Sequence, residues 1–257
     1  MRTALITGGA QGIGAAVARK FLREGFSDVL LVDRNAEKLA AMQKQIGKGA
    51  EIYMGDLRDK GTPADAVAKA IKSFGRLDVV VNAAGNTERC GIIDTTPEAF
   101  DRLFEVNVKA PLFIMQEAAK HMLAARSGVI INVASMLAYG GPPNLSAYSA
   151  SKSALMTLSK NAANTFKRDG IRVFCINLGW ALTDGEHEMQ TTLHKLPQNW
   201  AEEFGARMPF GRLITPDDVA GLCAFLVSPP AQMMTGAVID YEQMPVGTYD
   251  ILPALSP

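Results

Sequence analysis

A tyrosine and a lysine stand four residues apart in SAYSASKSALMTLSK, the stretch from Ser146 to Lys160. Its small and straight-chain residues, with a partly periodic set of apolar positions, predict a helix. Because positions i and i+4 share one helix face, the phenol of Tyr148 and the ammonium of Lys152 could converge on one point. A nearby cation favours the phenolate, so such a pair can accept and return a proton. The same spacing occurs by chance in many helices, and the pair therefore needs support from the rest of the chain.

A glycine-rich turn, TGGAQGIG, follows the first apolar run of the chain. Gly8, Gly12 and Gly14 have the spacing G-x-x-x-G-x-G, which differs from the commoner G-x-G-x-x-G. Glycines at a strand-to-helix junction allow a tight turn and a close approach to a pyrophosphate, which the helix N-terminus attracts. Asp33 ends the second apolar run, 19 residues after Gly14. An acid near that offset hydrogen-bonds the ribose hydroxyls of a dinucleotide, although it could also serve as a strand end or helix cap.

The acid at position 33 predicts NAD as the cofactor and makes NADP less favourable. The 2′-phosphate of NADP would lie where Asp33 points. Two like charges about 4 Å apart repel by roughly 4 kcal/mol at an effective dielectric constant near 20. Arg34 opposes this prediction, because a guanidinium can pair with a phosphate.

These residues belong to a chain that alternates short apolar runs with longer helical patterns. Continuous apolar runs are typical of strands buried on both faces of a parallel sheet. Strand–helix alternation predicts an α/β fold, a doubly wound (Rossmann) seven-stranded sheet flanked by helices, in one domain over residues 1–257. The expected strands are 3–7, 28–33, 51–56, 77–85, 128–135, 171–179 and 236–241, and the expected helices are 12–24, 36–46, 62–74, 97–125 and about 146–168.

Residues 183–213 interrupt this alternation with about 30 residues between the sixth strand and the next helix. The segment contains Gly185, Pro197, Gly205, Pro209 and Gly211. Connections of this length in a compact domain are usually functional, often as lids over a binding site. We expect a substrate lid here.

Composition excludes several other classes of protein. The 26 basic and 26 acidic residues give no net charge and argue against nucleic-acid binding. The sequence has no run of 18 apolar residues, so no membrane span is expected. The first residues do not resemble a signal peptide. Cys90, Cys175 and Cys223 form no CxxC pair, so we expect free thiols in the reducing cytoplasm. His187 and His194 have no third ligand nearby, and no metal site is predicted.

Taken together, TGGAQGIG, NAAG, Asn107, Ser135 and YSASK resemble the motifs of the short-chain dehydrogenase/reductase family, in matching order over nearly the whole chain. The resemblance implies that Tyr148 is the general acid/base and that Lys152 lowers its pKa and holds the ribose. It implies that Ser135 hydrogen-bonds the reacting oxygen and that Asn107 holds a water in a proton relay. A serine in an ordinary turn and an asparagine at a helix N-cap remain the alternatives for the last two.

The resemblance also assigns cofactor contacts by matching position. The glycine turn would hold the diphosphate, the end of the second strand the ribose, and the end of the third strand the adenine. The fourth strand would end beside the cofactor, and Thr183 would bond the carboxamide. The assigned positions are Gly8, Gln11, Gly12, Ile13, Gly14, Asp33, Arg34, Asp56, Leu57, Asn82, Ala83, Ala84, Gly85, Tyr148, Lys152, Gly179, Ala181 and Thr183.

Two departures from the family pattern stand out. Leu178 replaces the proline that usually precedes Gly179, so we expect a less rigid wall beside the nicotinamide. Near the C-terminus, DYEQMPVGTYD stands where an Asp-Gly-Gly turn is usual, and it is expected to reshape a neighbouring surface or the rim of the site.

The predicted reaction is hydride transfer between a secondary alcohol and NAD. A mixture of polar and aromatic side chains around the site favours a sugar or polyol, because sites that bind hydroxyls need matched polar partners. A 3-ketoacyl or steroid-type carbonyl reductase and a non-catalytic dinucleotide-binding regulatory protein are the alternatives. The resemblance implies pairing into a homotetramer through the helices around 107–125 and 147–168. The candidate substrate residues are Ser135, Met136, Tyr139, Asn144, Tyr148, Trp180 and His187, with Glu186 as a further candidate.

Overall fold

One parallel sheet of seven strands organises the computed structural model, which describes residues 2–247. The strand order is β3-β2-β1-β4-β5-β6-β7, so the predicted doubly wound α/β fold is confirmed. Ile6 at the centre of the sheet lies opposite Leu31 on one side and Val81 on the other. The strands are β1 Thr3–Thr7, β2 Asp28–Asp33, β3 Ala50–Met54, β4 Val79–Asn82, β5 Gly128–Val133, β6 Ile171–Leu178 and β7 Val238–Tyr241.

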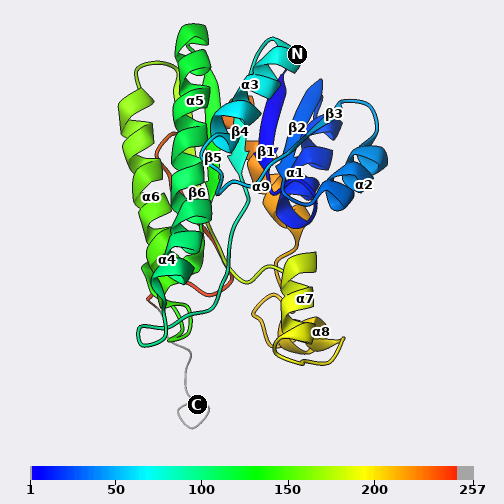
Figure 1. The fold of residues 1–257 in the computed structure, drawn as a ribbon, viewed down its shortest axis with the longest axis vertical. Coiled ribbons are helices and arrows are strands. Elements are labelled where there is room, and N and C mark those ends of the chain that lie inside the picture. Colours follow the sequence, from blue (N-terminus) through cyan, green and yellow to red (C-terminus); the bar gives the residue numbers. More distant parts are fainter. Residues whose placement is uncertain (1, 248–257) are drawn as a thin grey trace.

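Helices cover both faces of this sheet (Figure 1). Side chains of α1, α2 and α9 pack on one face, and those of α3, α5 and α6 pack on the other. The helices predicted from the sequence agree with the observed ones to within two residues at each end. The observed helices are α1 Gly12–Arg23, α2 Ala36–Ile46, α3 Thr62–Phe74, α4 Pro97–Phe104, α5 Ala110–Ala125, α6 Ser146–Phe166, α7 Asp184–Thr192, α8 Trp200–Gly205 and α9 Pro216–Leu226.

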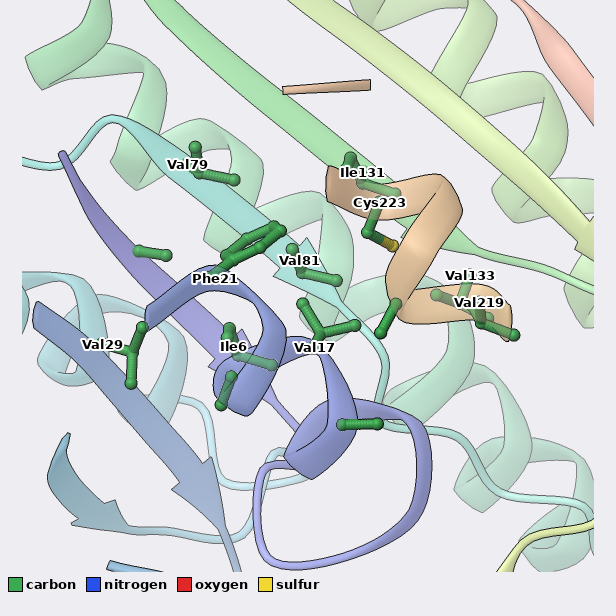
Figure 2. Close-up of a cluster of buried hydrophobic side chains, with 14 of the residues drawn as sticks. Ile6, Val17, Phe21, Val29, Val79, Val81, Ile131, Val133, Val219 and Cys223 are labelled. Carbon is green, nitrogen blue, oxygen red and sulfur yellow. The ribbon is translucent and has the colours of Figure 1, made fainter. Parts of the chain in front are cut away.

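The apolar core between α1, α9 and the sheet fixes the start of α1 against the end of β1. Figure 2 shows Val17 and Phe21 of α1 facing Val219 and Cys223 of α9, with strand side chains beneath them. Burying side chains of this size contributes about 1.5–3 kcal/mol each, which holds the helix firmly on the sheet. The strand residues labelled in the figure are Ile6, Val29, Val79, Val81, Ile131 and Val133.

A crevice is expected where the strand order reverses. From β1 the chain builds β2 and β3 on one side and β4 onward on the other, so β1 and β4 are neighbours with crossovers that leave in opposite directions. Ligands of open parallel sheets bind outside the carboxyl ends of the strands at this point. The glycine turn after β1, NAAG after β4 and Ser135 after β5 therefore meet at one edge of the sheet.

Residues 183–213 project beyond that edge and carry α7 and α8 (Figure 1). The segment is closed at its base, where Ala181 bridges to Ile214 and Leu182 N–H donates to the Ile214 carbonyl at 2.8 Å. Trp200 of α8 is fully buried beneath it. The C-terminal stretch DYEQMPVGTYD is described as far as residue 247, and its last three residues lie outside the described part of the chain.

The long helix predicted over 97–125 is interrupted at its centre. A π-helical turn, Glu105–Lys109, separates α4 from α5 and contains Asn107. Pro111 has no N–H and cannot donate to the Asn107 carbonyl four residues earlier, so one α-helical hydrogen bond is missing at this point. The helix N-cap is Thr96, whose side chain accepts the Ala99 N–H. The alternative that made Asn107 an N-cap is therefore wrong.

Two further observations concern the chain as a whole. Over residues 2–247, no helix combines the length and the apolar character needed to cross a membrane. Cys90, Cys175 and Cys223 are free and buried, and burial raises the thiol pKa of Cys175 to about 11 and that of Cys223 to about 12.

Candidate active site

The glycine turn between β1 and α1 has no room for side chains. Gly8 and Gly12 have φ values of +67° and +55°, in the left-handed region that favours glycine. A Cβ on Gly8 would lie 3.0 Å from the backbone of Ala84, and one on Gly14 would overlap the Gly8 carbonyl oxygen. Gln11 is the N-cap residue but makes no side-chain cap bond, so the first N–H groups of α1 can bind an anion. The turn thus fits the diphosphate of a dinucleotide.

Asp33 is held in place at the end of β2. Its Oδ2 accepts the Ala10 N–H at 3.3 Å and its Oδ1 accepts the Asn35 N–H at 3.0 Å. Beside it lies an open cavity of about 700 Å³, at the place where the sequence analysis puts the ribose and adenine. The cavity is lined by Arg34, Asn35, Tyr53, Met54, Gly55, Asp56, Arg58, Asp59 and Thr62.

An ion pair that the sequence analysis did not anticipate stands in this cavity. Arg58 contacts Asp56 at 2.6 Å and lowers the pKa of its carboxyl group through that hydrogen bond. Of the two residues assigned to the adenine, Asp56 lines the cavity, whereas Leu57 packs against the apolar core. Arg58 adds a second guanidinium to that of Arg34. Because a guanidinium can pair with a 2′-phosphate, this arginine favours NADP.

A buried polar network fixes the ends of β4 and β5. Asn82 Nδ2 donates to Asn132 Oδ1 at 2.8 Å, and Asn132 Nδ2 donates to Ser159 of α6 at 2.9 Å. The N–H groups of Ala83 and Ala84 both donate to Thr7 of β1 at 3.1 Å. The NAAG segment is therefore tied to the strands on each side and to α6.

Tyr148 and Lys152 lie on the buried face of α6, as the helical spacing predicts. Their exposed fractions are 9% and 4%, and Lys152 Nζ is 5.7 Å from the centroid of the tyrosine ring. Nζ donates to the Val133 carbonyl at the end of β5 at 2.9 Å. A Cβ on Gly85 would lie 3.6 Å from that Nζ and 3.8 Å from Asn107 Oδ1, so NAAG, Asn107 and Lys152 meet.

The protonation equilibria of this pair are dominated by burial. Burial raises the pKa of Tyr148, whereas a hydrogen bond with Ser135 lowers it and the charge of Glu186 raises it. Burial lowers the pKa of Lys152 to about 8. Burial is the largest influence on the pKa of Tyr148, and that Lys152 lowers this pKa during the reaction stays a prediction.

Asn107 is fastened to its surroundings through its whole side-chain amide. Nδ2 donates to the Asn86 carbonyl at 2.8 Å and to Ser151 Oγ at 3.0 Å, and Oδ1 accepts the Asn86 N–H at 2.8 Å. Ser151 in turn donates to the carbonyl of Tyr148 at 2.6 Å. The side chain therefore links NAAG to α6, with both amide protons donated and one bond accepted by Oδ1, whereas its backbone carbonyl is the one to which Pro111 cannot donate.

Ser135 and the segment after it lie beside Tyr148. Ser135 Oγ accepts the Leu137 N–H at 3.2 Å, and its hydroxyl group forms the hydrogen bond that lowers the pKa of Tyr148. Met136 is half-buried, but Tyr139 is 51% exposed and its phenol donates to Asp240 of β7 at 3.0 Å. Asn144 is exposed. Ser135 and Met136 are thus buried or half-buried, whereas Tyr139 and Asn144 are exposed, and the contact of all four with substrate stays a prediction.

Trp180 and His187 belong to an aromatic cluster at the base of the 183–213 segment. The Trp180 ring stacks on Trp200 at 5.5 Å between centroids, and Phe204 meets it edge-on at 5.4 Å. His187 Nδ1 accepts the Trp200 indole N–H at 3.2 Å, so the imidazole is held within this segment, and its contact with substrate stays a prediction. Thr183 caps α7 and lies against Gly12, over the glycine turn.

Sequence reasoning missed several residues that complete the site. Asn86 and Ser151 directly adjoin assigned residues, Gly85 and Lys152, and that adjacency was the available signal. Arg58 likewise adjoins an assigned residue, Leu57, and forms its ion pair with Asp56, two residues earlier. Gln243 holds the 183–213 segment from outside it, since its amide bonds the Phe210 N–H at 2.8 Å and the Arg212 carbonyl at 2.7 Å.

Comparison with known proteins agrees with this geometry. A family model described as short chain dehydrogenase matches residues 2–194. Sorbitol dehydrogenase of Cereibacter sphaeroides is 36% identical over 248 residues, which covers 94% of this chain and 96% of that protein. The 4-formylbenzenesulfonate dehydrogenase TsaC1/TsaC2 of Comamonas testosteroni is also 36% identical, with the same coverage. The crystal structure of YwfH, an NADPH-dependent reductase involved in bacilysin biosynthesis, matches with a TM-score of 0.88 at 26% identity, over 96% of this chain and 99% of that one.

Proposed function

The chain belongs to the short-chain dehydrogenase family, and we propose that it transfers a hydride between a secondary alcohol of a sugar or polyol and NAD. One observation carries the proposal. Tyr148 and Lys152 are buried side by side on α6, next to Ser135 and at the edge of the sheet where the glycine turn opens. Burying a phenol and an ammonium together is costly, and such costs are typical of catalytic sites.

Each of these side chains has a distinct task in the proposed reaction. When bound, NAD would supply the ring that accepts the hydride. Tyr148 would take the hydroxyl proton on its phenol oxygen as general base. Ser135 would donate its hydroxyl proton to the same substrate oxygen, where charge develops, in place of its bond with Tyr148.

Lys152 and Asn107 would carry the proton onward. With a pKa of about 8, Lys152 is mostly charged at neutral pH, and its bond to Val133 uses one of three protons. The other two can hold the ribose and a water. We assign that water to the backbone carbonyl of Asn107, because the side-chain amide is already held by Asn86 and Ser151 and Pro111 cannot donate to the carbonyl.

NAD is favoured over NADP by the rigid position of Asp33. Its two backbone bonds keep the carboxylate at the end of β2, where a 2′-phosphate would meet it. Repulsion of about 4 kcal/mol per pair of charges at 4 Å corresponds to more than two decades of affinity. Arg34 and Arg58 oppose this, but Arg58 is already paired with Asp56.

Residues 183–213 are proposed as the substrate lid. The segment stands over the glycine turn through Thr183 and over the site through Trp180, and its base is fixed by the bridge between Ala181 and Ile214. A sugar or polyol as substrate is supported by the identity to a sorbitol dehydrogenase and by the polar groups that Trp180 and the lid bring to the site.

Assembly into a homotetramer is proposed through α5. Leu112, Phe113 and Leu123 of this helix are 39–41% exposed although large and apolar, and covering them against another copy would remove that surface from water. Light scattering coupled to size-exclusion chromatography gives the mass directly, and a monomer at micromolar concentration would contradict the proposal.

The function is tested with a panel of sugars, polyols and hydroxy acids, offered with NAD and NADP, with reduced nicotinamide as the readout. Tyr148→Phe removes the proton acceptor and is expected to lower turnover at least about 100-fold, with NAD binding retained. Tyr241→Phe is the matched control, because its hydroxyl bonds the Asp218 carbonyl away from the site. Turnover by Tyr148→Phe equal to that of the control would refute the assignment.

A further inference from the structure

Glu186, in the first turn of α7, directs its carboxylate away from the N-terminus of its own helix. The sequence Thr-x-x-Glu is the pattern of a capping box, in which the glutamate bonds the N-cap N–H. At α9 the same chain forms a complete box between Thr215 and Asp218. At α7, Thr183 accepts the Glu186 N–H at 3.1 Å, but the carboxylate is bound to other side chains.

Two immobile donors orient this carboxylate. Trp180 Nε1 donates at 2.9 Å and Gln190 Nε2 at 2.7 Å, both to Oε1. Trp180 is stacked on the fully buried Trp200, and Gln190 is itself only 7% exposed. Oε2 takes part in none of the hydrogen bonds within residues 2–247. One oxygen is therefore fixed and the other is presented to a partner.

The presented oxygen belongs to the candidate active site. Trp180 follows β6 at the edge of the sheet where Ser135 follows β5, so the carboxylate that Trp180 holds stands at the same edge. Glu186 is also close enough to act on the Tyr148 phenol, whose pKa its charge raises. The charged groups around Tyr148 are then Lys152 on its own helix and Glu186 on α7.

We propose that Glu186 selects the substrate, its free oxygen accepting a hydrogen bond from a hydroxyl group adjacent to the reacting carbinol. A carboxylate only accepts hydrogen bonds, so a vicinal diol satisfies it, a simple alcohol leaves it unpaired, and a hydroxy acid brings a repelling charge. This inference rests on the proposed dehydrogenase function. It names the residue that binds the hydroxyl group next to the reacting carbinol of the proposed sugar or polyol, and it excludes hydroxy acids as good substrates.

The test compares butane-2,3-diol, butan-2-ol and 3-hydroxybutyrate as probes with NAD. The wild-type protein is expected to favour the diol over the hydroxy acid at least about tenfold in kcat/KM. Glu186→Gln keeps an oxygen for Trp180 and Gln190 but removes the charge. In this variant we expect the ratio of kcat/KM for the diol to kcat/KM for the hydroxy acid to fall at least about tenfold. Charge-assisted hydrogen bonds are roughly twice as strong as neutral ones, and the repulsion between Glu186 and the hydroxy acid is lost.

A second readout separates this role from a structural one. Without the negative charge of Glu186 the pKa of Tyr148 falls, so the acid limb of kcat/KM for diol oxidation should move to lower pH. Glu188→Gln is the matched control, since Glu188 is exposed on the same helix, and neither readout should change. An unchanged ratio in Glu186→Gln, or an equal change in the control, overturns the proposal.

Another variant keeps the test valid if Glu186→Gln does not fold. Gln190→Met removes one donor and leaves the charge, so the kcat/KM for the diol should fall while the acid limb stays in place. A diol kcat/KM equal to wild type in this variant also overturns the proposal. A wild-type protein that oxidises none of the probes and no polyol overturns the proposed function itself, whereas an active protein with an unchanged ratio overturns only the role of Glu186.

Discussion

Replacing Lys152 by methionine should abolish activity. Relative to the wild-type protein, it should also stabilise the cofactor-free fold more at low pH than at high pH. The ammonium is 4% exposed and has one bond, to the Val133 carbonyl. Burial lowers its pKa from 10.5 to about 8. Below that value the native state carries a buried charge that the unfolded chain solvates freely, and a neutral side chain of similar length removes the penalty.

The magnitude follows from the pKa difference between the folded and unfolded states. Each pKa unit is worth about 1.4 kcal/mol, so burying the charge costs about 3 kcal/mol at pH 6. Between pH 8 and 10.5 the unfolded state binds more protons than the native state, and wild-type stability rises with pH. By linkage, burying the lysine still costs about 1 kcal/mol at pH 9.5. The gain in unfolding free energy of Lys152→Met over the wild type should therefore shrink by about 2 kcal/mol from pH 6 to 9.5.

Urea denaturation without cofactor at both pH values measures this difference. Methionine also leaves the Val133 carbonyl without its donor, which costs about 1–3 kcal/mol at every pH, so the change with pH is the decisive quantity. Lys160→Met, on the exposed side of α6, is the control and should show no such change. A stability difference for Lys152→Met that is constant from pH 6 to 9.5 would refute the assignment of a costly buried charge.

Three other substitutions have definite expected outcomes. Asp33→Asn should shift the kcat/KM ratio from NAD toward NADP at least about tenfold, whereas Asp59→Asn, in the same cavity, should leave it within about threefold; equal shifts would contradict the role of Asp33. Asp218→Asn should lower the free energy of unfolding by about 1 kcal/mol at pH 7 through the lost cap. Because Arg212 holds the pKa of Asp218 well below its usual range, this loss should begin to shrink as the pH falls below the unfolded value of roughly 3.9 and should vanish only as the pH falls through the lower native-state pKa. A loss that stays constant in this acid range would contradict the reasoning. Gly14→Ala should abolish dinucleotide binding in calorimetry, since its Cβ overlaps a carbonyl oxygen of the turn, and normal binding would show that the turn can relax.

The strands and most helices could be predicted because burial on two faces leaves a direct trace in sequence. The apolar runs Thr3–Thr7 and Asp28–Asp33 are continuous, and the observed strands have the same bounds. The π-helical turn at Asn107 could not be read from periodicity, since it depends on one missing hydrogen bond. Pro111 is visible in the sequence, but packing decides whether the helix kinks, ends or takes in an extra residue at a proline.

Within the site, positions were predictable where family motifs fixed them, but orientations were not. The helical spacing placed Tyr148 and Lys152 on one face, and both are buried there. Tyr139 shares a segment with Ser135, yet its phenol is drawn to Asp240, a residue 101 positions later in the chain. Partners so distant in sequence leave no local pattern. The Trp180 and Gln190 bonds of Glu186 are local, but the Thr-x-x-Glu pattern predicts a capping box instead of them.

The two departures from the family pattern act on the same wall of the site and partly offset each other. Leu178 in place of proline restores a rotatable backbone before Gly179, which alone would loosen that wall. However, the Gly179 N–H donates to the Tyr241 carbonyl at 3.0 Å, and the Glu242 carboxylate packs so closely that a Cβ on Gly179 would overlap it. Gln243, the next residue, bonds the backbone at the end of the 183–213 segment. Side chains that replace a glycine turn thus restrain both the wall and the segment above it, and the expected loss of rigidity at Leu178 is compensated from β7.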